Sequence, residues 1–170
     1  PMLERFRLGY APEGRDDFYR AALKAGFSAE VLEKAGLVSA KDNQVFLDRF
    51  RGRVIFPIHN VAGKTIAFGA RILKTDARAP KYVNSPETEI YHKSHIVYGI
   101  YQAKNAIRQK ENCFLVEGYT DVISLHQAGI ENVVASSGTS LTVEQIRLIG
   151  RFTENITVLY DGDPAGIRAS

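Results

Sequence analysis

The sequence is poor in the residues that form disulfides and zinc sites. It has one cysteine, Cys113, and no tryptophan, and its four histidines are not grouped at the spacing of zinc ligands. A lone cysteine cannot form a disulfide within the chain and suits a reducing compartment, so we expect a cytoplasmic protein. No stretch approaches the roughly 18 consecutive apolar residues of a membrane helix, and the N-terminus has no apolar signal-peptide core. We therefore expect no membrane partner.

Length and charge bear on the organisation of the chain. A length of 170 residues suits one ordinary domain or two small ones, and a first residue Pro1 in place of Met suggests a piece of a longer protein. Residues 1–110 carry 19 Lys and Arg against 11 Asp and Glu, whereas residues 111–170 carry 3 against 8. A basic half that holds a polyanion beside an acidic half that holds cations would explain this division. Ordinary variation in surface charge would explain it equally well.

The basic half mixes helix and strand patterns. Apolar residues at helical spacing predict helices at 14–27, 28–38 and 98–110. A hairpin is expected over 53–73, because β-branched residues lie on both sides of the turn sequence "NVAG". Residues 80–91 carry two prolines and several turn residues, and they predict an ordered loop. These patterns indicate an α+β subdomain over residues 1–110.

From residue 111 onward, strands and helices alternate. Strands are expected at 113–118, 132–138 and 155–163, and helices at 119–129, 142–152 and, as first turns only, 164–170. Strands that alternate with helices of about ten residues imply a parallel sheet with right-handed crossovers. The fold class is therefore α/β plus α+β: a basic α+β subdomain, then a partial parallel βαβαβα subdomain over 111–170.

Acidic residues follow two of the predicted parallel strands. Glu117 closes the first strand, and Asp161 and Asp163 close the third. Functional residues of parallel sheets gather at these carboxyl ends, and Asp121 lies one helical turn after Glu117. Alone, the pair Asp161 and Asp163 is better explained as a turn; the second acidic strand end makes a cation site the preferred interpretation. Oxygen ligands without Cys or His favour Mg²⁺ or Mn²⁺, which serve phosphoryl transfer.

Basic residues concentrate between residues 49 and 81. In "RFRGR", Arg49, Arg51 and Arg53 alternate, so in an extended chain they would share one face and could contact phosphates. A charged edge strand that blocks aggregation is an equally good interpretation of this segment. The following loop adds Lys81 and Asn84, a mixture of groups that suits nucleotide binding.

Six segments together resemble the bacterial replicative DNA primases of the DnaG type. They are "RFRGRVIFPI", "PKYVNSPET", "HKSHIVYGIYQA", "FLVEGYTDVISLHQAG", "ASSGTSLT" and "LYDGDPAG". The resemblance as a whole covers nearly the entire chain, from about Gly14 to Ser170. The acidic motifs alone would indicate only the wider Toprim group, which includes topoisomerases and some nucleases. "PKY.NSPET" followed by "HK" and "YG" is far more specific to primases. By this resemblance the second subdomain is a Toprim domain, truncated at its C-terminal side.

The resemblance also implies roles for individual residues. Glu117, Asp161 and Asp163 would be catalytic and would bind metal, with Asp121 as a supporting metal ligand. Nucleotide and nucleic-acid contacts would come from the matching polar and basic positions, which are Arg51, Arg53, Arg71, Lys81, Asn84 and Lys93.

The activity implied is the synthesis of short RNA primers from ribonucleoside triphosphates on single-stranded DNA, with Mg²⁺ or Mn²⁺ as cofactor. The expected partners are the replicative helicase and the single-strand-binding protein, at the replication fork in the bacterial cytoplasm. Zinc belongs to a family domain absent from this chain, and the fragment alone is expected to be weakly active or inactive. The alternatives are a Toprim nuclease or topoisomerase, and a non-catalytic nucleic-acid-binding module.

Overall fold

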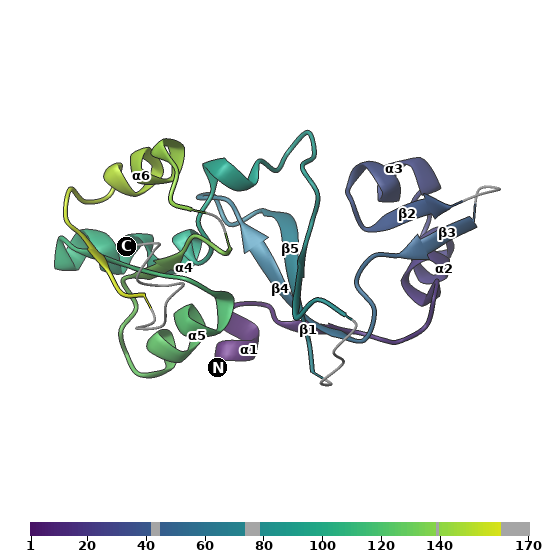
Figure 1. The fold of residues 1–170 in the computed structure, drawn as a ribbon, viewed down its shortest axis with the longest axis horizontal. Coiled ribbons are helices and arrows are strands. Elements are labelled where there is room, and N and C mark those ends of the chain that lie inside the picture. The colour runs from purple at the N-terminus through teal and green to yellow at the C-terminus, as the bar shows by residue number, and fades with distance from the viewer. Residues whose placement is uncertain (42–44, 74–78, 139, 161–170) are drawn as a thin grey trace. The chain divides into compact units, whose positions relative to one another are not determined.

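A computed structural model describes residues 1–41, 45–73, 79–138 and 140–160 of the chain (Figure 1). The chain forms two compact units. The antiparallel unit comprises residues 8–57 and 67–91, and the parallel unit comprises residues 1–7, 58–66 and the described residues from 92 onward. These units do not coincide with the division at residue 110, which rests on the change of sequence pattern.

An antiparallel sheet forms the centre of the antiparallel unit. It contains β1 (Gly9–Ala11), β4 (Arg53–His59), β5 (Thr65–Ile72) and β6 (Tyr82–Asn84) in the order β1-β4-β5-β6. Strands β4 and β5 are hydrogen-bonded neighbours, which confirms the predicted hairpin, and their connecting turn belongs to the parallel unit. Asn60 stabilises this turn, because its Oδ1 accepts hydrogen bonds of 3.0 Å from the backbone N–H groups of Ala62 and Lys64.

The segment predicted as a loop at 80–91 is partly a strand. Residues Tyr82–Asn84 form β6 and pair with β5 in antiparallel register, with Ala70 opposite Val83. The two prolines had argued against a strand, but β6 is an edge strand of three residues, and Pro86 follows its end.

A smaller layer packs two helices on a two-stranded sheet. It consists of α2 (Asp17–Lys24), α3 (Ala29–Lys34), β2 (Val38–Lys41) and β3 (Val45–Asp48). The two predicted helices are confirmed, although both are shorter than predicted, and Ser28 caps α3 by accepting a 3.3 Å hydrogen bond from Val31 N–H. Gly36 follows α3 with φ +69°, a conformation that favours glycine. The hairpin of β2 and β3 was not predicted.

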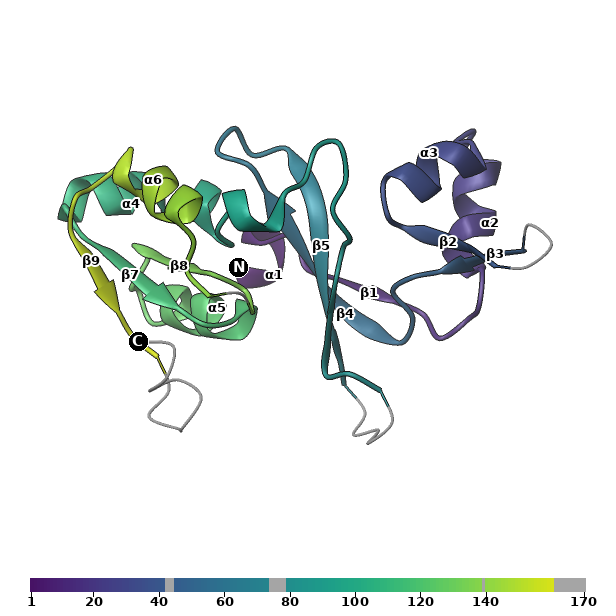
Figure 2. The same ribbon diagram turned by 45° about the horizontal axis from the view of Figure 1, so that its top comes forward.

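The parallel unit contains the predicted α/β pattern. Its elements are α1 (Met2–Arg5), η2 (Lys93–His95), α4 (Ile100–Lys110), β7 (Cys113–Val116), α5 (Tyr119–Gln127), β8 (Val133–Ala135), α6 (Val143–Gly150) and β9 (Ile156–Val158). The three strands are parallel in the order β8-β7-β9, which confirms the parallel sheet. Figure 2 shows α5 on one face of this sheet and α4 and α6 on the other. The chain reverses its direction across the sheet after β8, so right-handed crossovers place α5 and α6 on opposite faces.

A fully buried apolar cluster packs α4 and α6 against the parallel sheet. Its members come from the sheet and from the layer of α4 and α6 with the segment before α4, and they are Val97, Ile100, Ala103, Ile107, Cys113, Leu115, Val134 and Ile149. Burial of each large aliphatic side chain contributes roughly 1.5–3 kcal/mol, which outweighs the weak intrinsic preferences of such short strands. Burial also raises the pKa of the Cys113 thiol to about 12, so this cysteine is a packing residue. Within the described ranges, no helix is long and apolar enough to cross a membrane.

Candidate functional site

Glu117 lies at the carboxyl edge of the parallel sheet. It follows β7 directly, and the register pairs Val116 with Ala135 and Leu115 with Val158, so all three strands end at the same edge. In the order β8-β7-β9 the chain passes from β7 to β8 on one side and then crosses back to β9 on the other, so the strand order reverses at β7, which is the topological switch point of the sheet. Ligands of open α/β sheets bind at such points. The structure thus places Glu117 where the sequence predicted a site.

Backbone hydrogen bonds hold Glu117 against the loop that follows β8. Its carbonyl oxygen accepts a 3.0 Å hydrogen bond from Ser137 N–H, and the side chain is half-buried. Tyr160, two residues after β9, lies at the same edge. Burial raises the pKa of Tyr160, a hydrogen bond with Ser136 opposes this rise, and the Glu117 carboxylate adds to it. The sequence did not lead us to predict Ser136 or Tyr160 as neighbours of Glu117. Their positions just after β8 and β9 could have indicated this, because the strands end at the same edge.

Asp121 has a structural contact at the start of α5. Its Oδ2 accepts a 2.9 Å hydrogen bond from Gly118 N–H, so the carboxylate closes the first turn of the helix that follows Glu117. The positive end of the helix dipole favours a negative charge at this position. Asp121 therefore lies one turn from Glu117, as predicted, with one of its oxygens engaged in capping.

The predicted ligands Asp161 and Asp163 lie outside the described residues. Within the described ranges, no three His, Cys, Asp or Glu side chains gather as a potential metal site. All four predicted ligands are carboxylates, and Glu117 and Asp121 follow the end of β7 at the switch point. This donor set fits a hard divalent cation and does not fit zinc.

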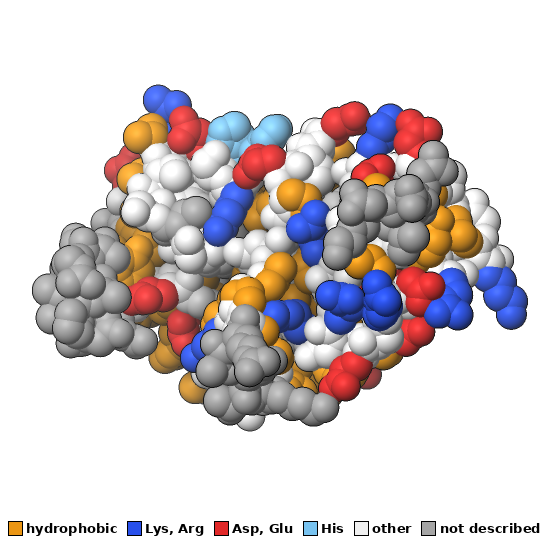
Figure 3. All heavy atoms as spheres, turned by 45° about the vertical axis from the view of Figure 1, so that its right-hand side comes forward, with side chains coloured by type: hydrophobic (Ala, Val, Ile, Leu, Met, Phe, Trp, Pro, Cys, Tyr) orange, Lys and Arg blue, Asp and Glu red, His pale blue; other side chains and the backbone are white. Residues whose placement is uncertain are grey.

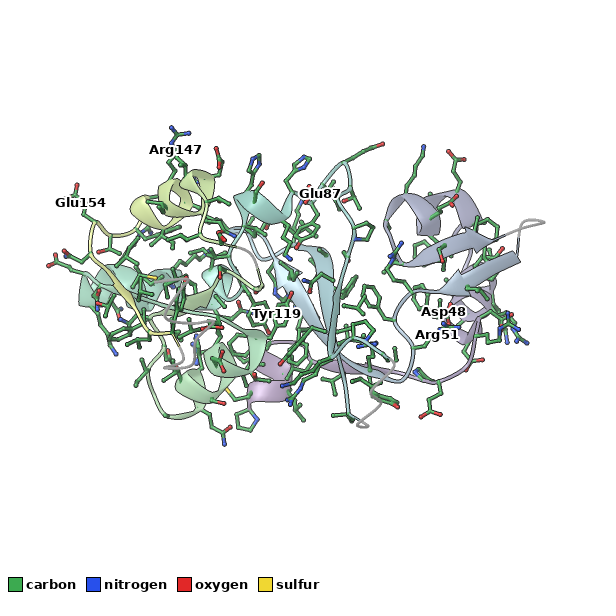
Figure 4. All side chains as sticks on the ribbon, in the orientation of Figure 1. Asp48, Arg51, Glu87, Tyr119, Arg147 and Glu154 are labelled. Carbon is green, nitrogen blue, oxygen red and sulfur yellow. The ribbon has the colours of Figure 1, made fainter. Side chains whose placement is uncertain are left out.

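The predicted rail of alternating arginines is not formed. Residues Arg49 and Phe50 are in a bend and Gly52 has φ +61°, so the segment is not extended. Arg53 is only 7% exposed, its Nη1 donates a 3.3 Å hydrogen bond to the carbonyl of Lys81, and burial lowers its pKa. Arg51 is exposed (Figure 4). The left-handed Gly52 interrupts the extended backbone between Arg51, which is exposed, and Arg53, which is buried, and the alternating pattern did not predict this.

Three other predicted contact residues gather around β6 in the antiparallel unit. Arg71 pairs directly with Tyr82, and its Cζ atom lies 5.8 Å from the centre of the Tyr82 ring. Lys81 Nζ lies 5.9 Å from the same ring, and Asn84 is opposite Gly69. Two cations near one aromatic ring present charge and a stacking surface together. Figure 3 shows Lys and Arg side chains gathered over the middle of the face that it presents.

Lys93 belongs to the parallel unit, whereas the other predicted contact residues belong to the antiparallel unit. It begins the 3₁₀ turn η2, and its Nζ donates a 3.4 Å hydrogen bond to the carbonyl of Gly138, in the loop after β8. This loop also contacts Glu117 through Ser137. The structure therefore brings Lys93 to the loop at the carboxyl edge of the sheet.

Comparisons with known proteins agree with this architecture. The family described as "DNA primase catalytic core, N-terminal domain" matches residues 1–104, and the family described as "Toprim-like" matches residues 114–170. The DNA primase of Geobacillus stearothermophilus is 45% identical over 168 residues, which cover 99% of this chain and 28% of that protein. The chain thus spans about a quarter of the length of this relative.

Solved structures match over a larger share of their chains. The crystal structure of the RNA polymerase domain of Mycobacterium tuberculosis primase DnaG has a TM-score of 0.90 and 38% identity, covering 99% of this chain and 57% of that one. The structure of a DnaG primase catalytic domain bound to ssDNA has a TM-score of 0.86 and 43% identity, covering 99% and 52%. Sequence, sheet order and these likenesses lead to one conclusion: the chain belongs to the bacterial DnaG-type DNA primase family and contains the N-terminal domain of its catalytic core followed by a Toprim-like segment.

Proposed function

We propose that the protein to which this chain belongs synthesises short RNA primers on single-stranded DNA from ribonucleoside triphosphates. The observation that carries this proposal is the position of Glu117 at the switch point of the parallel sheet, in a chain of the primase family. The relative whose structure contains ssDNA supports single-stranded DNA as the template. The 170-residue chain alone is expected to be weakly active or inactive.

The carboxylates Glu117, Asp161 and Asp163, supported by Asp121, would hold Mg²⁺ or Mn²⁺. Bound there, such ions would activate the attacking hydroxyl and neutralise charge on the leaving pyrophosphate. The chain's own contribution is placement: β7 and the capped start of α5 fix Glu117 and Asp121.

The basic residues would bind the polyanions. Arg71, Lys81 and Asn84 around β6 suit contact with the template or the incoming nucleotide, and exposed Arg51 suits contact with phosphates. Arg53 is buried beneath Lys81, whose backbone it holds, so its contribution would come mainly through that contact. Lys93 would contact phosphate near the sheet edge. The replicative helicase and single-strand-binding protein would be partners in the bacterial cytoplasm.

The reaction type is tested in one assay that follows both the DNA template and any new RNA. The full-length protein is incubated with a labelled single-stranded template, ribonucleoside triphosphates and Mg²⁺ or Mn²⁺. We expect labelled ribonucleotides to enter new short RNA while the template stays intact. Template cleavage without RNA synthesis would identify a nuclease instead, and salt-dependent binding without either reaction would identify a binding module.

A further inference from the structure

The turn that carries Lys93 is fastened to the first turn of α6 by two side chains. The hydroxyl of Thr142 donates a 2.5 Å hydrogen bond to the carbonyl of Ser94. The amide Nε2 of Gln145 donates hydrogen bonds of 2.8 Å to the carbonyl of Ile96 and 3.3 Å to that of Lys93. Gln145 has 0% of its surface exposed. Three carbonyls of η2 and its flank are thus held by donors from α6.

Ordinary helix capping does not account for these bonds. Thr142 Oγ1 accepts from Gln145 N–H and Gln145 Oε1 accepts from Thr142 N–H, both at 3.2 Å, which is a complete capping box. A capping box uses only the acceptor oxygens of the two side chains. The hydroxyl proton and both amide hydrogens are left over, and all three are directed at carbonyls of 93–96.

The loop after β8 connects Lys93 with Glu117. Lys93 Nζ donates to Gly138 O, while Ser137 N–H donates to the carbonyl of Glu117. Ser137 and Gly138 both have positive φ, 60° and 82°, so this loop is a tight and specific turn. A shift of η2 along the sheet edge would therefore move the Lys93 ammonium relative to the turn that holds Glu117.

We propose that Thr142 and Gln145 are positioning residues for Lys93. They fix the backbone at the base of a long flexible side chain, which lowers the ordering cost when its ammonium contacts an anionic ligand. This inference rests on the proposed role of Lys93 in nucleotide or template binding. Their effect on binding passes through Lys93, because their donors are bonded to the carbonyls of Lys93, Ser94 and Ile96.

Two matched substitutions separate tethering from capping. Thr142→Ser keeps both the acceptor and the hydroxyl proton, whereas Thr142→Asp caps a helix equally well but has no proton to donate to Ser94 O. Gln145→Leu removes the amide at similar volume. Each variant is made in the full-length protein, with and without Lys93→Ala, and urea unfolding confirms that it is folded under the assay conditions.

Binding of ATP and of a fluorescent single-stranded oligodeoxynucleotide is then titrated. For the probe whose binding Lys93→Ala weakens, we expect Thr142→Asp and Gln145→Leu each to lower the affinity by about fivefold. Thr142→Ser should bind this probe within about twofold of wild type. In the Lys93→Ala background, the same substitutions should add less than about twofold.

The outcomes distinguish the inference from the function on which it rests. If Lys93→Ala binds both probes like wild type, the proposed role of Lys93 is wrong and the positioning role falls with it. If Lys93→Ala weakens binding but Thr142→Asp does not, the positioning role alone is overturned. Equal losses in both backgrounds would also overturn it, because they would show a charge or folding effect independent of Lys93.

Discussion

His126 makes the stability of the parallel unit sensitive to acid. Its imidazole is 2% exposed in α5 and packs edge-on against Phe6, with ring centres 5.0 Å apart. Burial lowers the pKa of His126 to about 4, and the nearby Arg5 guanidinium adds to this, while Glu131 opposes it. The folded protein therefore keeps the neutral imidazole, and the unfolded chain takes up the proton first. The stability that the neutral His126 contributes to the folded protein is fully present above about pH 6.5 and is lost as the pH falls toward 4.

The size of this effect follows from the two pKa values. With about 4 in the folded state and 6.5 in the unfolded state, proton linkage gives a loss of about 2 kcal/mol between pH 7.5 and pH 5.0. Because the side chain is almost fully buried, solvent screening reduces this figure little. The substitution His126→Phe keeps an aromatic ring beside Phe6 and removes the titrating group.

The assay is urea unfolding of wild type and His126→Phe at both pH values. We expect the free energy of unfolding of wild type to fall by about 2 kcal/mol more than that of the variant between pH 7.5 and pH 5.0. Titrating groups that are not coupled to His126, such as His59, are present in both proteins, so their contributions cancel in this comparison. Identical pH dependence in the two proteins would refute the burial argument.

Two further substitutions test the antiparallel unit. Asp48 is buried, and its carboxylate accepts hydrogen bonds of 2.7 and 2.9 Å from the N–H groups of Phe18 and Tyr19 in the first turn of α2. Asp48→Ala should therefore lower the free energy of unfolding, measured by urea denaturation, by about 2–3 kcal/mol. The exposed Glu30 offers a control, and an equal loss for Glu30→Ala would contradict this account. Lys81→Ala should weaken binding of a single-stranded oligonucleotide without lowering stability, and unchanged affinity at moderate salt would count against its role.

The sequence predicted the parallel unit well because its signals are local. Buried parallel strands appear as short apolar runs such as 113–116 and 133–135, and the helices between them have a clear apolar stripe. Glu117 could be placed at a strand end for the same reason. The carboxyl ends of parallel strands meet at one edge, so topology alone brings separated residues toward each other.

Tertiary contacts account for what the sequence did not predict. The strands β2 and β3 are four residues each, and their pairing is stabilised by packing on α2 and α3, which no local pattern reveals. Arg53 looked like its neighbours Arg49 and Arg51, yet the hairpin buries it against Lys81. The tethering of Lys93 by Thr142 and Gln145 joins residues about fifty positions apart. Only the folded chain shows such a contact.

The central claim is that Glu117 is a catalytic metal-binding carboxylate at the switch point. Primer synthesis by the full-length protein is measured on single-stranded template with Mg²⁺, for wild type, Glu117→Gln and the control Glu154→Gln, whose exposed carboxylate lies just before β9 (Figure 4). We predict that Glu117→Gln lowers the rate by at least about 100-fold and that Glu154→Gln leaves it unchanged. Equal rates for Glu117→Gln and wild type would contradict the assignment.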